Sequence, residues 1–156
     1  MAEVVYRATR SRMMSGIRGK DTAPELAVRR YLHAAGYRFR LHGKGLPGSP
    51  DLVMKKHRLV IFVHGCFWHH HPGCFYATSP ATRKEFWQDK LTRNAQRDEE
   101  QRLLLAGLGW RVLVVWECGT RHAADEMEEI AHFIDGDTAL GHWPKVPPRI
   151  RKKKPD

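Results

Sequence analysis

The 156-residue chain is predicted to form one mixed α/β domain around a central sheet, and three patterns support this fold class. Two strongly apolar runs, residues 59–63 and 110–116, have the composition of buried strands. Between them, a capping box near residue 82 and a set of side chains that recur at three- and four-residue spacing predict a helix to about residue 108. A strand, a helix and then a second strand after only a short link from the helix predict two parallel neighbours in one sheet.

The charge balance of the chain points to a polyanionic partner. Lys and Arg number 27 against 17 Asp and Glu, a formal charge of +10. Such an excess suits nucleic acid, although a basic surface with no binding role is the alternative. No apolar run approaches the ~20 residues of a membrane helix, and the amino terminus lacks the pattern of a secretion signal. Three cysteines cannot all pair within one chain, so we expect reduced thiols and a cytoplasmic protein.

Composition divides the chain into three segments. Residues 1–20 form a basic arm, which suits a phosphate backbone or a merely solvated face. Residues 21–135 carry the regular periodicities and are expected to be the folded domain. Residues 136–156 are rich in Pro and Gly and end in a basic run, so we expect a flexible tail.

The first half of the folded domain is predicted to contain a helix, a strand and a loop. The helix begins at a capping box, Thr22 with Glu25 three residues later, and ends at Gly36. Residues 37–41 alternate apolar and basic side chains, as a half-buried strand does. The Gly and Pro residues of 43–50 cannot continue either element and predict a loop.

A hairpin, a long helix and a shorter helix account for the remainder. Residues 51–54 and the apolar run after them flank a short polar turn, which predicts antiparallel pairing. A second capping box, Thr82 with Glu85, opens the long helix. Residues 123–134 predict a smaller amphipathic helix. One face of the long helix carries the recurring residues Trp87, Leu91, Asn94, Asp98, Gln101 and Leu105.

Cysteine and histidine residues gather where a structural zinc ion could use them. Cys66, His71 and Cys74 closely follow the first apolar run, and Cys118 follows the second. If the two runs are parallel neighbours, their carboxyl ends meet and complete a set of three cysteines and one histidine. Four such ligands leave no open position on zinc, so the ion would be structural and would hold the irregular loop in place. Three unrelated thiols are the alternative.

Acids and a histidine near the ends of the hairpin strands predict phosphodiester chemistry. Asp51 begins one strand, where its carboxylate could bind Mg²⁺ together with waters and a phosphate. His69 lies outside the zinc set, and an imidazole has a pKa suited to activating a water. Asp98 could orient that imidazole, and Glu25 could reach the site through a water. Each acid also has a purely structural interpretation. Asp51 could simply begin a strand, Asp98 could be an exposed acid on a helix, and Glu25 is already explained as a capping residue.

Adjacent aromatic residues occur twice, as Phe67-Trp68 in the metal loop and Phe86-Trp87 at the start of the long helix. Core packing explains Phe86. Phe67 and Trp68 are harder to bury, because a loop tied to a surface metal surrounds them. Apolar side chains driven between base steps unstack a duplex at a cost of a few kcal/mol, and least where the bases are already mismatched. The pair therefore predicts contact with a damaged or mismatched duplex.

Specific motifs follow one another between about residues 8 and 118: Asp21-Thr22-Ala23-x-Glu25, Leu46-Pro47-Gly48-x-Pro50-Asp51, Phe62-x-His64-Gly65-Cys66-Phe67-Trp68-His69-His70-His71, Pro80-Ala81-Thr82-Arg83-x-Glu85-Phe86-Trp87 and Gly109-Trp110-Arg111-Val112-Leu113-x-Val115-Trp116-Glu117-Cys118. In this order they resemble the bacterial very-short-patch repair endonucleases. One departure is Pro72-Gly73 between His71 and Cys74, which changes the spacing in the loop.

The resemblance implies a restriction-endonuclease-like fold, with a mixed central sheet flanked by helices and a structural zinc site. It implies a nick in one strand of double-stranded DNA, on the 5′ side of the thymine in a T:G mismatch that arises when 5-methylcytosine deaminates. The implied enzyme is a Mg²⁺-dependent monomer at the bacterial nucleoid. Its implied partners are other repair proteins and a functionally linked cytosine methyltransferase.

The same resemblance implies a role for individual residues. Mg²⁺ would be held by Asp51 and the backbone carbonyl of Val63. His69 would be the general base with Asp98 in support, and Glu25 and His64 would bind catalytic waters or phosphate. The duplex would be entered beside the mismatch by Phe67, Trp68 and Trp87, and structural zinc would be held by Cys66, His71, Cys74 and Cys118.

The residues alone leave two other classes of function open. One is a zinc-stabilised DNA-binding module without catalysis. The other is a zinc hydrolase in which His69, His70 and His71 bind a catalytic metal. A pure DNA-binding module has no use for the Asp51 carboxylate beside a phosphate, so this residue distinguishes the first class from an endonuclease.

Overall fold

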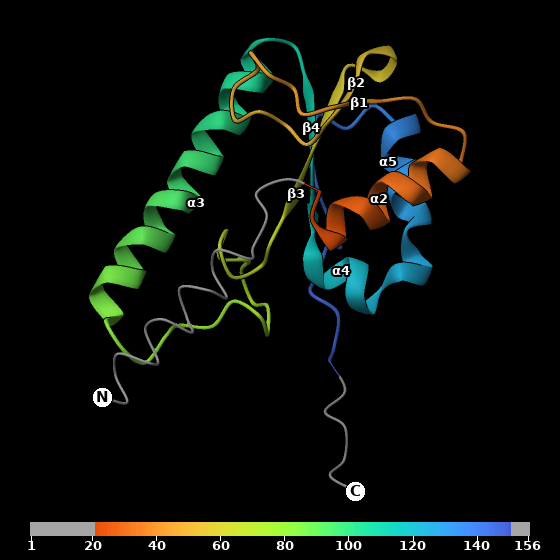
Figure 1. The fold of residues 1–156 in the computed structure, drawn as a ribbon. Helices are drawn as coiled ribbons and strands as arrows, with labels where there is room; N and C mark the ends of the chain where they lie inside the picture. Colours follow the sequence, from red (N-terminus) through yellow and green to blue (C-terminus); the bar gives the residue numbers. More distant parts are fainter. Residues whose placement is uncertain (1–20, 151–156) are drawn as a thin grey trace, which may run out of the picture.

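A five-stranded sheet forms the centre of the computed structural model, which describes residues 21–150 (Figure 1). The expectations for residues 1–20 and 151–156 lie outside the described residues. Strand order in the sheet follows chain order, and β1, β2 and β3 are antiparallel whereas β3, β4 and β5 are parallel. The predicted mixed sheet is confirmed. The strands are β1 (Arg40–Leu41), β2 (Leu52–Met54), β3 (Leu59–His64), β4 (Arg111–Trp116) and β5 (Leu140–Trp143).

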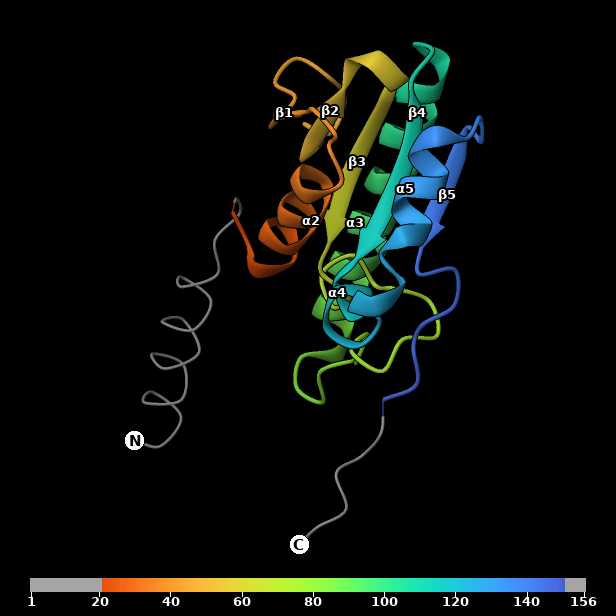
Figure 2. The same ribbon diagram turned by 90° about the vertical axis from the view of Figure 1, so that its right-hand side faces the viewer.

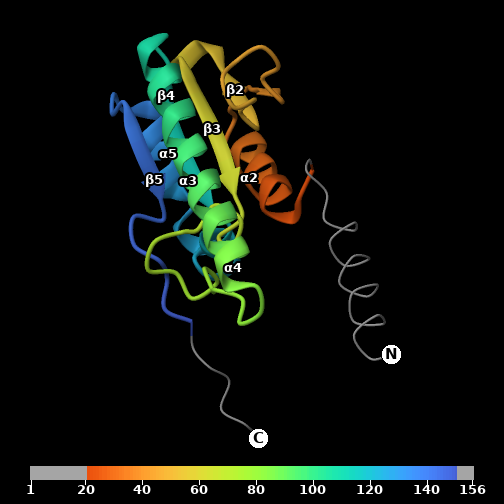
Figure 3. The same cartoon turned by 90° about the vertical axis from the view of Figure 1, so that its left-hand side faces the viewer.

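Helices cover both faces of the sheet and make a three-layered domain. Among the helices of residues 21–150, only the long helix α3 (Lys84–Gly107) lies on one face (Figure 3). The opposite face is covered by α2 (Ala23–Ala34), α4 (Glu117–His122) and α5 (Glu128–Asp135) (Figure 2). Alternate residues of the central strands point into two separate apolar cores, one under each helical layer. Within residues 21–150, no helix is both long and apolar enough to cross a membrane.

The pairing of β3 with β4 decides where the functional residues meet. The two strands run in parallel register from Leu59 opposite Arg111 to His64 opposite Trp116. Almost every residue in both strands is buried, as expected for strands covered on both faces. Helix α3 is the crossover between them. The segments that follow β3 and β4 therefore leave the sheet side by side, which confirms the arrangement predicted from the two apolar runs.

The start of α2 agrees with its capping prediction, and the start of α3 does not. The Thr22 hydroxyl accepts a hydrogen bond from the Glu25 N–H at 3.4 Å. The capping residue of α3 is Arg83, which has a φ of 54° and provides no side-chain cap, so the predicted box at Thr82 is wrong. The helix instead begins after a turn in left-handed backbone. The helix predicted over 123–134 is also shorter, because a 3₁₀ turn at Ala124–Glu126 precedes α5.

The fifth strand corrects the prediction of a flexible tail from residue 136. Residues 140–143 pair with β4, and Trp143 at the end of β5 is 2% exposed. Gly141 permits close packing here, because a Cβ atom at this position would lie 2.3 Å from the Phe133 ring of α5. An edge strand of four residues with a glycine and a histidine lacks the apolar pattern of a central strand. The folded domain therefore extends beyond residue 135.

Candidate active site

The three cysteines and His71 converge at the carboxyl ends of β3 and β4. Their ligand atoms all lie within 4.8 Å of one another. His71 Nδ1 lies 3.7 Å from Cys66 Sγ and 3.5 Å from Cys118 Sγ. In a tetrahedral zinc site the separation of such a nitrogen and sulfur is about 3.5 Å, given Zn–N and Zn–S bonds of about 2.0 and 2.3 Å. The donor set and its spacing fit a structural zinc ion, held by Cys66, His71, Cys74 and Cys118.

The electrostatics of these thiols also favour a cation. The contact with Cys118, followed by that with His71, lowers the pKa of the Cys66 thiol to about 4. The same Cys66–Cys118 contact raises the pKa of Cys118, and burial raises that of Cys74. The cluster by itself therefore stabilises one thiolate at the expense of the other two. A divalent cation would stabilise all three.

The cluster of zinc-ligand residues, called the metal cluster below, holds the loop between β3 and α3. It consists of Cys66, His71, Cys74 and Cys118. This segment, residues 65–83, contains no helix or strand and is long for an irregular connection. Cys118 N–H donates to Cys66 Sγ at 3.4 Å, and the His71 ring stacks on Trp116 with centroids 4.0 Å apart. The loop is thereby tied to β4 and α4 as well as to its own strand.

Next to the cluster, His69 pairs with an acid on α3. His69 Nδ1 lies 2.6 Å from Asp98 Oδ2. Because a carboxylate accepts and does not donate, this contact places the ring proton on Nδ1 and leaves Nε2 free to take up a proton. The His69 side chain is 30% exposed, so this nitrogen can reach a substrate. The structure thus brings together the predicted histidine and its predicted orienting acid.

His64 packs flat against His69. The two rings stack with centroids 3.7 Å apart and an interplanar angle of 5°. His64 is 7% exposed, and burial, together with the nearby His69, lowers its pKa well below the ordinary value. His64 is therefore a neutral imidazole at neutral pH, and it fixes the plane of the His69 ring. An imidazole binds a metal through a lone pair that lies in the plane of its ring. Because the two rings are parallel and stacked, one ion cannot lie in both ring planes, so this pair is a poor metal site.

Asp51 and Glu25 form an acid pair beside the end of β3. The Asp51 carboxylate accepts a hydrogen bond from the Val63 N–H at 2.7 Å. Burial raises the Asp51 pKa to about 7, opposed by the Val63 hydrogen bond and supported by contact with Glu25. Glu25 is 2% exposed. A buried carboxyl beside a half-buried one favours a shared proton or a cation, and such an oxygen donor set fits Mg²⁺.

The three consecutive histidines do not share one metal. His71 faces the cysteines, whereas His69 faces Asp98. Between them, the exposed His70 has a left-handed backbone with a φ of 48°. This arrangement contradicts the class in which all three bind a catalytic zinc.

The aromatics of the two predicted pairs lie together, and Phe86 packs on Trp87 at the edge of the group with ring centroids 5.6 Å apart. The ring centroids of Phe67, Trp68 and Trp87 lie 5.1 to 6.0 Å apart, and Lys90 Nζ lies 5.7 Å from the Trp68 and Trp87 rings. Trp87 is 7% exposed, while Phe67 and Trp68 are partly exposed. Phe86 is 44% exposed, so its assignment to the core is wrong. The cluster combines planar surfaces with a positive charge.

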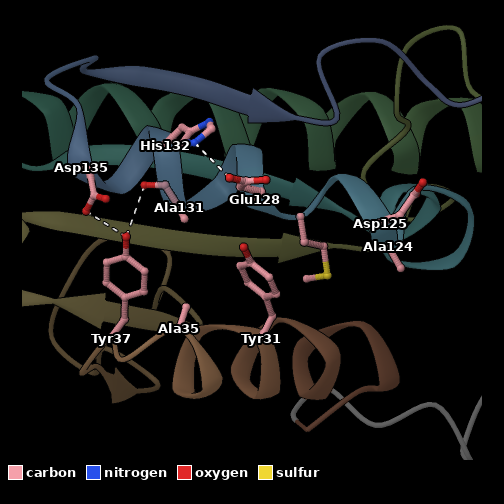
Figure 4. A pocket seen from close by; sticks show the side chains of 10 residues that line it. Tyr31, Ala35, Tyr37, Ala124, Asp125, Glu128, Ala131, His132 and Asp135 are labelled. Carbon is pink, nitrogen blue, oxygen red and sulfur yellow. Dashed lines mark hydrogen bonds and ion pairs between the residues drawn. The ribbon is translucent and has the colours of Figure 1, made fainter.

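One hollow of the domain lies away from these residues. It has a volume of about 530 Å³ and separates α2 from α5, on the sheet face opposite α3 (Figure 4). Tyr37 donates a hydrogen bond to Asp135 at its wall, at 2.8 Å. Its further lining includes the acids Asp125 and Glu128 and no catalytic candidate. A smaller hollow of about 350 Å³ adjoins Trp87 at the start of α3.

One charged residue of the site, Arg29, was not predicted from the sequence. Arg29 on α2 lies 3.0 Å from Glu25, four residues earlier, and is itself largely buried. The four-residue spacing is a signal that could have suggested this pair. It could not have revealed the burial, because that depends on how α2 lies on the sheet.

The mixed sheet, the acid pair and the histidine–acid pair on a strongly basic chain describe a DNA endonuclease of the restriction-endonuclease-like class. Comparison with known proteins agrees with this class and narrows it. Residues 2–75 match the family model described as DNA mismatch endonuclease Vsr. The chain belongs to the Vsr DNA mismatch endonuclease family of strand-nicking enzymes, which confirms the resemblance described above.

Individual relatives are similar over most of their length. The DNA mismatch endonuclease Vsr of Escherichia coli (strain K12) is 49% identical over 144 residues, which cover 89% of this chain and 92% of the relative. The type II nicking enzyme V.XorIIP of Xanthomonas oryzae pv. oryzae is 53% identical over 68% of this chain and 77% of its own. The type II nicking enzyme V.NmeAIP of Neisseria meningitidis is 38% identical over 86% and 95%.

Proposed function

We propose that this endonuclease nicks one DNA strand 5′ of the thymine in a T:G mismatch and so initiates very-short-patch repair. The observation that carries the proposal is the meeting of two pairs, Asp51 with Glu25 and His69 with Asp98, at the end of β3. The aromatic cluster beside them supports a mismatched substrate. The mismatch would come from deaminated 5-methylcytosine, which links the enzyme to a cytosine methyltransferase.

Asp51 and the Val63 carbonyl are proposed to hold Mg²⁺. The N–H and C=O of one strand residue point to the same side of the strand. Because the Val63 N–H donates to Asp51, the Val63 carbonyl faces the same side, beyond the last β2–β3 pair of Leu52 with Ile61. When bound, Mg²⁺ would polarise the phosphodiester and stabilise the leaving oxygen. Glu25 would orient a water in the same place.

His69 is proposed to be the general base. Asp98 holds its Nδ1–H, and Nε2 then accepts a proton from the attacking water. The stacked, neutral His64 keeps the ring in place and contacts the phosphate or its water. Residues 1–20 are proposed to add contacts to the DNA backbone, with the protein acting as a monomer. Its repair partners would act after the nick.

Asp98→Asn is expected to lower the single-turnover nicking rate about 100-fold. An amide can donate to Nδ1, which moves the ring proton to Nε2 and removes the acceptor that the reaction requires. Affinity for DNA should change little. Asp89→Asn, a matched change at an exposed position of the same helix, should nick at the wild-type rate. Equal rates for both variants would contradict the role of Asp98.

Trp68→Ala is expected to weaken binding to a T:G duplex by about 10-fold, since stacking on a base contributes about 1–3 kcal/mol. Affinity for a fully paired T:A duplex should fall less. Phe75→Ala removes a 61% exposed aromatic from the same loop but outside the cluster and should leave both affinities unchanged. Fluorescence anisotropy with both duplexes measures the difference. An equal loss on the two duplexes would count against intercalation at the mismatch.

The function as a whole is tested by nicking assays on T:G duplexes with varied flanking bases, with and without Mg²⁺. We expect one nick, 5′ of the thymine, that requires Mg²⁺ and depends on the flanking sequence. Activity with zinc in place of Mg²⁺ would contradict the proposed metal. Equal cleavage of T:G and T:A duplexes would contradict the proposed substrate.

A further inference from the structure

A group of charge-assisted contacts at the start of α2 holds the Glu25 carboxylate. Arg29 Nη2 lies 3.0 Å from Glu25 Oε2, and the Asp21 N–H donates to the same oxygen at 2.9 Å. The guanidinium also binds Asp21 Oδ1, through Nη1 at 2.7 Å. Oε1 of Glu25 takes no part in these contacts. One edge of the carboxylate is therefore fixed, and the other is left for the site that contains Asp51.

The burial of this group is unusual for an ion pair within one helix. The side chains of Arg29 and Glu25 are 11% and 3% exposed. Arg29 Nε is buried and has no hydrogen-bond partner among the described residues. Burying a guanidinium with an unsatisfied N–H is costly, and apolar residues of similar volume are often at least as stabilising as a buried ion pair. Stability alone is thus a poor reason for placing an arginine here.

The backbone around Asp21 is shaped to complete the same contacts. Asp21 has a φ of 56°, in the left-handed region that non-glycine residues seldom adopt. Its carboxylate lies 3.7 Å from His42 Nε2, and the His42 N–H donates to the Asp51 carbonyl at 3.0 Å. The contacts therefore connect α2 to the backbone of the strand start that carries Asp51. The position of Glu25 relative to Asp51 is therefore fixed by contacts to Glu25 within α2 and by the His42 contact to the Asp51 backbone.

We propose that Arg29 is a positioning residue for strand nicking, which holds Glu25 Oε2 so that the carboxylate stays oriented beside Asp51. The inference rests on the proposed catalytic role of the Asp51–Glu25 pair. Arg29 binds Glu25 and Asp21, and its effect on the reacting atoms is exerted through Glu25. A misplacement of about 1 Å at a catalytic group costs on the order of 100-fold in rate.

The first test compares Arg29→Ala with Arg30→Ala, which removes the same charge from the exposed neighbouring position. With enzyme saturating over a T:G duplex and Mg²⁺ present, Arg29→Ala should lower the nicking rate about 10- to 100-fold. Its Kd for the duplex should stay within about 3-fold of wild type. A change confined to the geometry of the reacting groups lowers the rate of the chemical step but not the affinity for DNA. Arg30→Ala should match the wild-type rate. Equal rates for the two variants would overturn the proposal.

Arg29→Lys keeps the charge and serves as the conservative variant should the alanine variant not fold. A lysine can reach one carboxylate but cannot bridge Glu25 and Asp21 as the guanidinium fork does. Its nicking rate should therefore fall between those of wild type and Arg29→Ala. A folded Arg29→Lys protein with the full wild-type rate would count against the bridging role.

A double-mutant cycle with Glu25→Gln separates this inference from the function it rests on. If Arg29 acts through Glu25, Arg29→Ala should have almost no further effect on the rate of a Glu25→Gln enzyme. A full additional loss would show that Arg29 acts elsewhere and would overturn the inference. If Glu25→Gln leaves nicking unchanged, the proposed role of Glu25 fails together with the inference. If Glu25→Gln slows nicking but Arg29→Ala does not, only the inference fails.

Discussion

Replacing Asp51 with alanine is expected to lower the nicking rate by at least about 1,000-fold and to leave binding of a T:G duplex nearly unchanged. The carboxylate is the only proposed side-chain ligand of Mg²⁺, and its loss removes the stabilisation of the leaving oxygen. Binding is proposed to depend instead on the aromatic cluster around Trp68 and on the basic surface. An anionic group facing phosphate repels DNA unless a cation lies between them, so its removal should not weaken the complex.

The fold should tolerate this substitution, for a reason that can be checked through pH. The Asp51 pKa of about 7 lies above the value of about 3.9 expected in the unfolded chain. The folded state therefore holds its proton more tightly, and this residue reduces stability progressively as pH rises from about 4 to 7. In Asp51→Ala that loss is absent. The relief from this penalty offsets the cost, about 1–3 kcal/mol, of leaving the Val63 N–H without an acceptor.

Three measurements on one preparation test the Asp51 prediction: the single-turnover nicking rate, the Kd for the T:G duplex and the melting temperature in buffer without Mg²⁺ or chelator at pH 5 and 8. Asp125→Ala, a substitution at an exposed acid far from the site, is the control. Loss of nicking and binding together in a folded Asp51→Ala protein would contradict the assignment. So would nicking at a rate within 10-fold of wild type.

The arrangement of the centre of this fold could be predicted because it follows from short-range patterns. Two apolar runs joined through a helix predict parallel neighbours, and parallel neighbours predict that Cys118 joins Cys66. The His69–Asp98 pair was also within reach, since Asp98 lies on the inner face of the predicted long helix. In each case a single assumption, that the two apolar runs are parallel neighbours joined through the helix, is enough to predict which residues lie close together.

Features that depend on tertiary packing could not be predicted in the same way. Strand β5 has too few apolar residues to be recognised, and it becomes a strand because Trp143 is buried and Phe133 packs over Gly141. The cap at Arg83 depends on the preceding loop, which the metal cluster holds. Burial of Arg29 depends on how α2 lies against the sheet. The sequence contains these residues but not the surfaces that they meet.

The metal cluster should be as important for the fold as Asp51 is for the reaction. Structural zinc contributes about 10–16 kcal/mol in zinc-finger peptides, which is comparable to the whole stability of a typical domain, about 5–15 kcal/mol. We expect His71→Ala or Cys118→Ala to lose zinc and to melt well below wild type. Protein purified without chelator should contain one zinc per chain, and strong chelators should lower its melting temperature toward that of the variants.

His70→Ala is the matched control, because this neighbouring histidine is exposed and faces neither the cysteines nor Asp98. It should keep its zinc and its melting temperature. Loss of zinc should also weaken mismatch binding, since the cluster ties the loop that carries Phe67 and Trp68 to β4 and α4. Less than one zinc per chain, or equal melting temperatures for His71→Ala and His70→Ala, would contradict a structural zinc. Retained mismatch binding in a zinc-free variant would instead show that the aromatic cluster holds the loop in place without the metal.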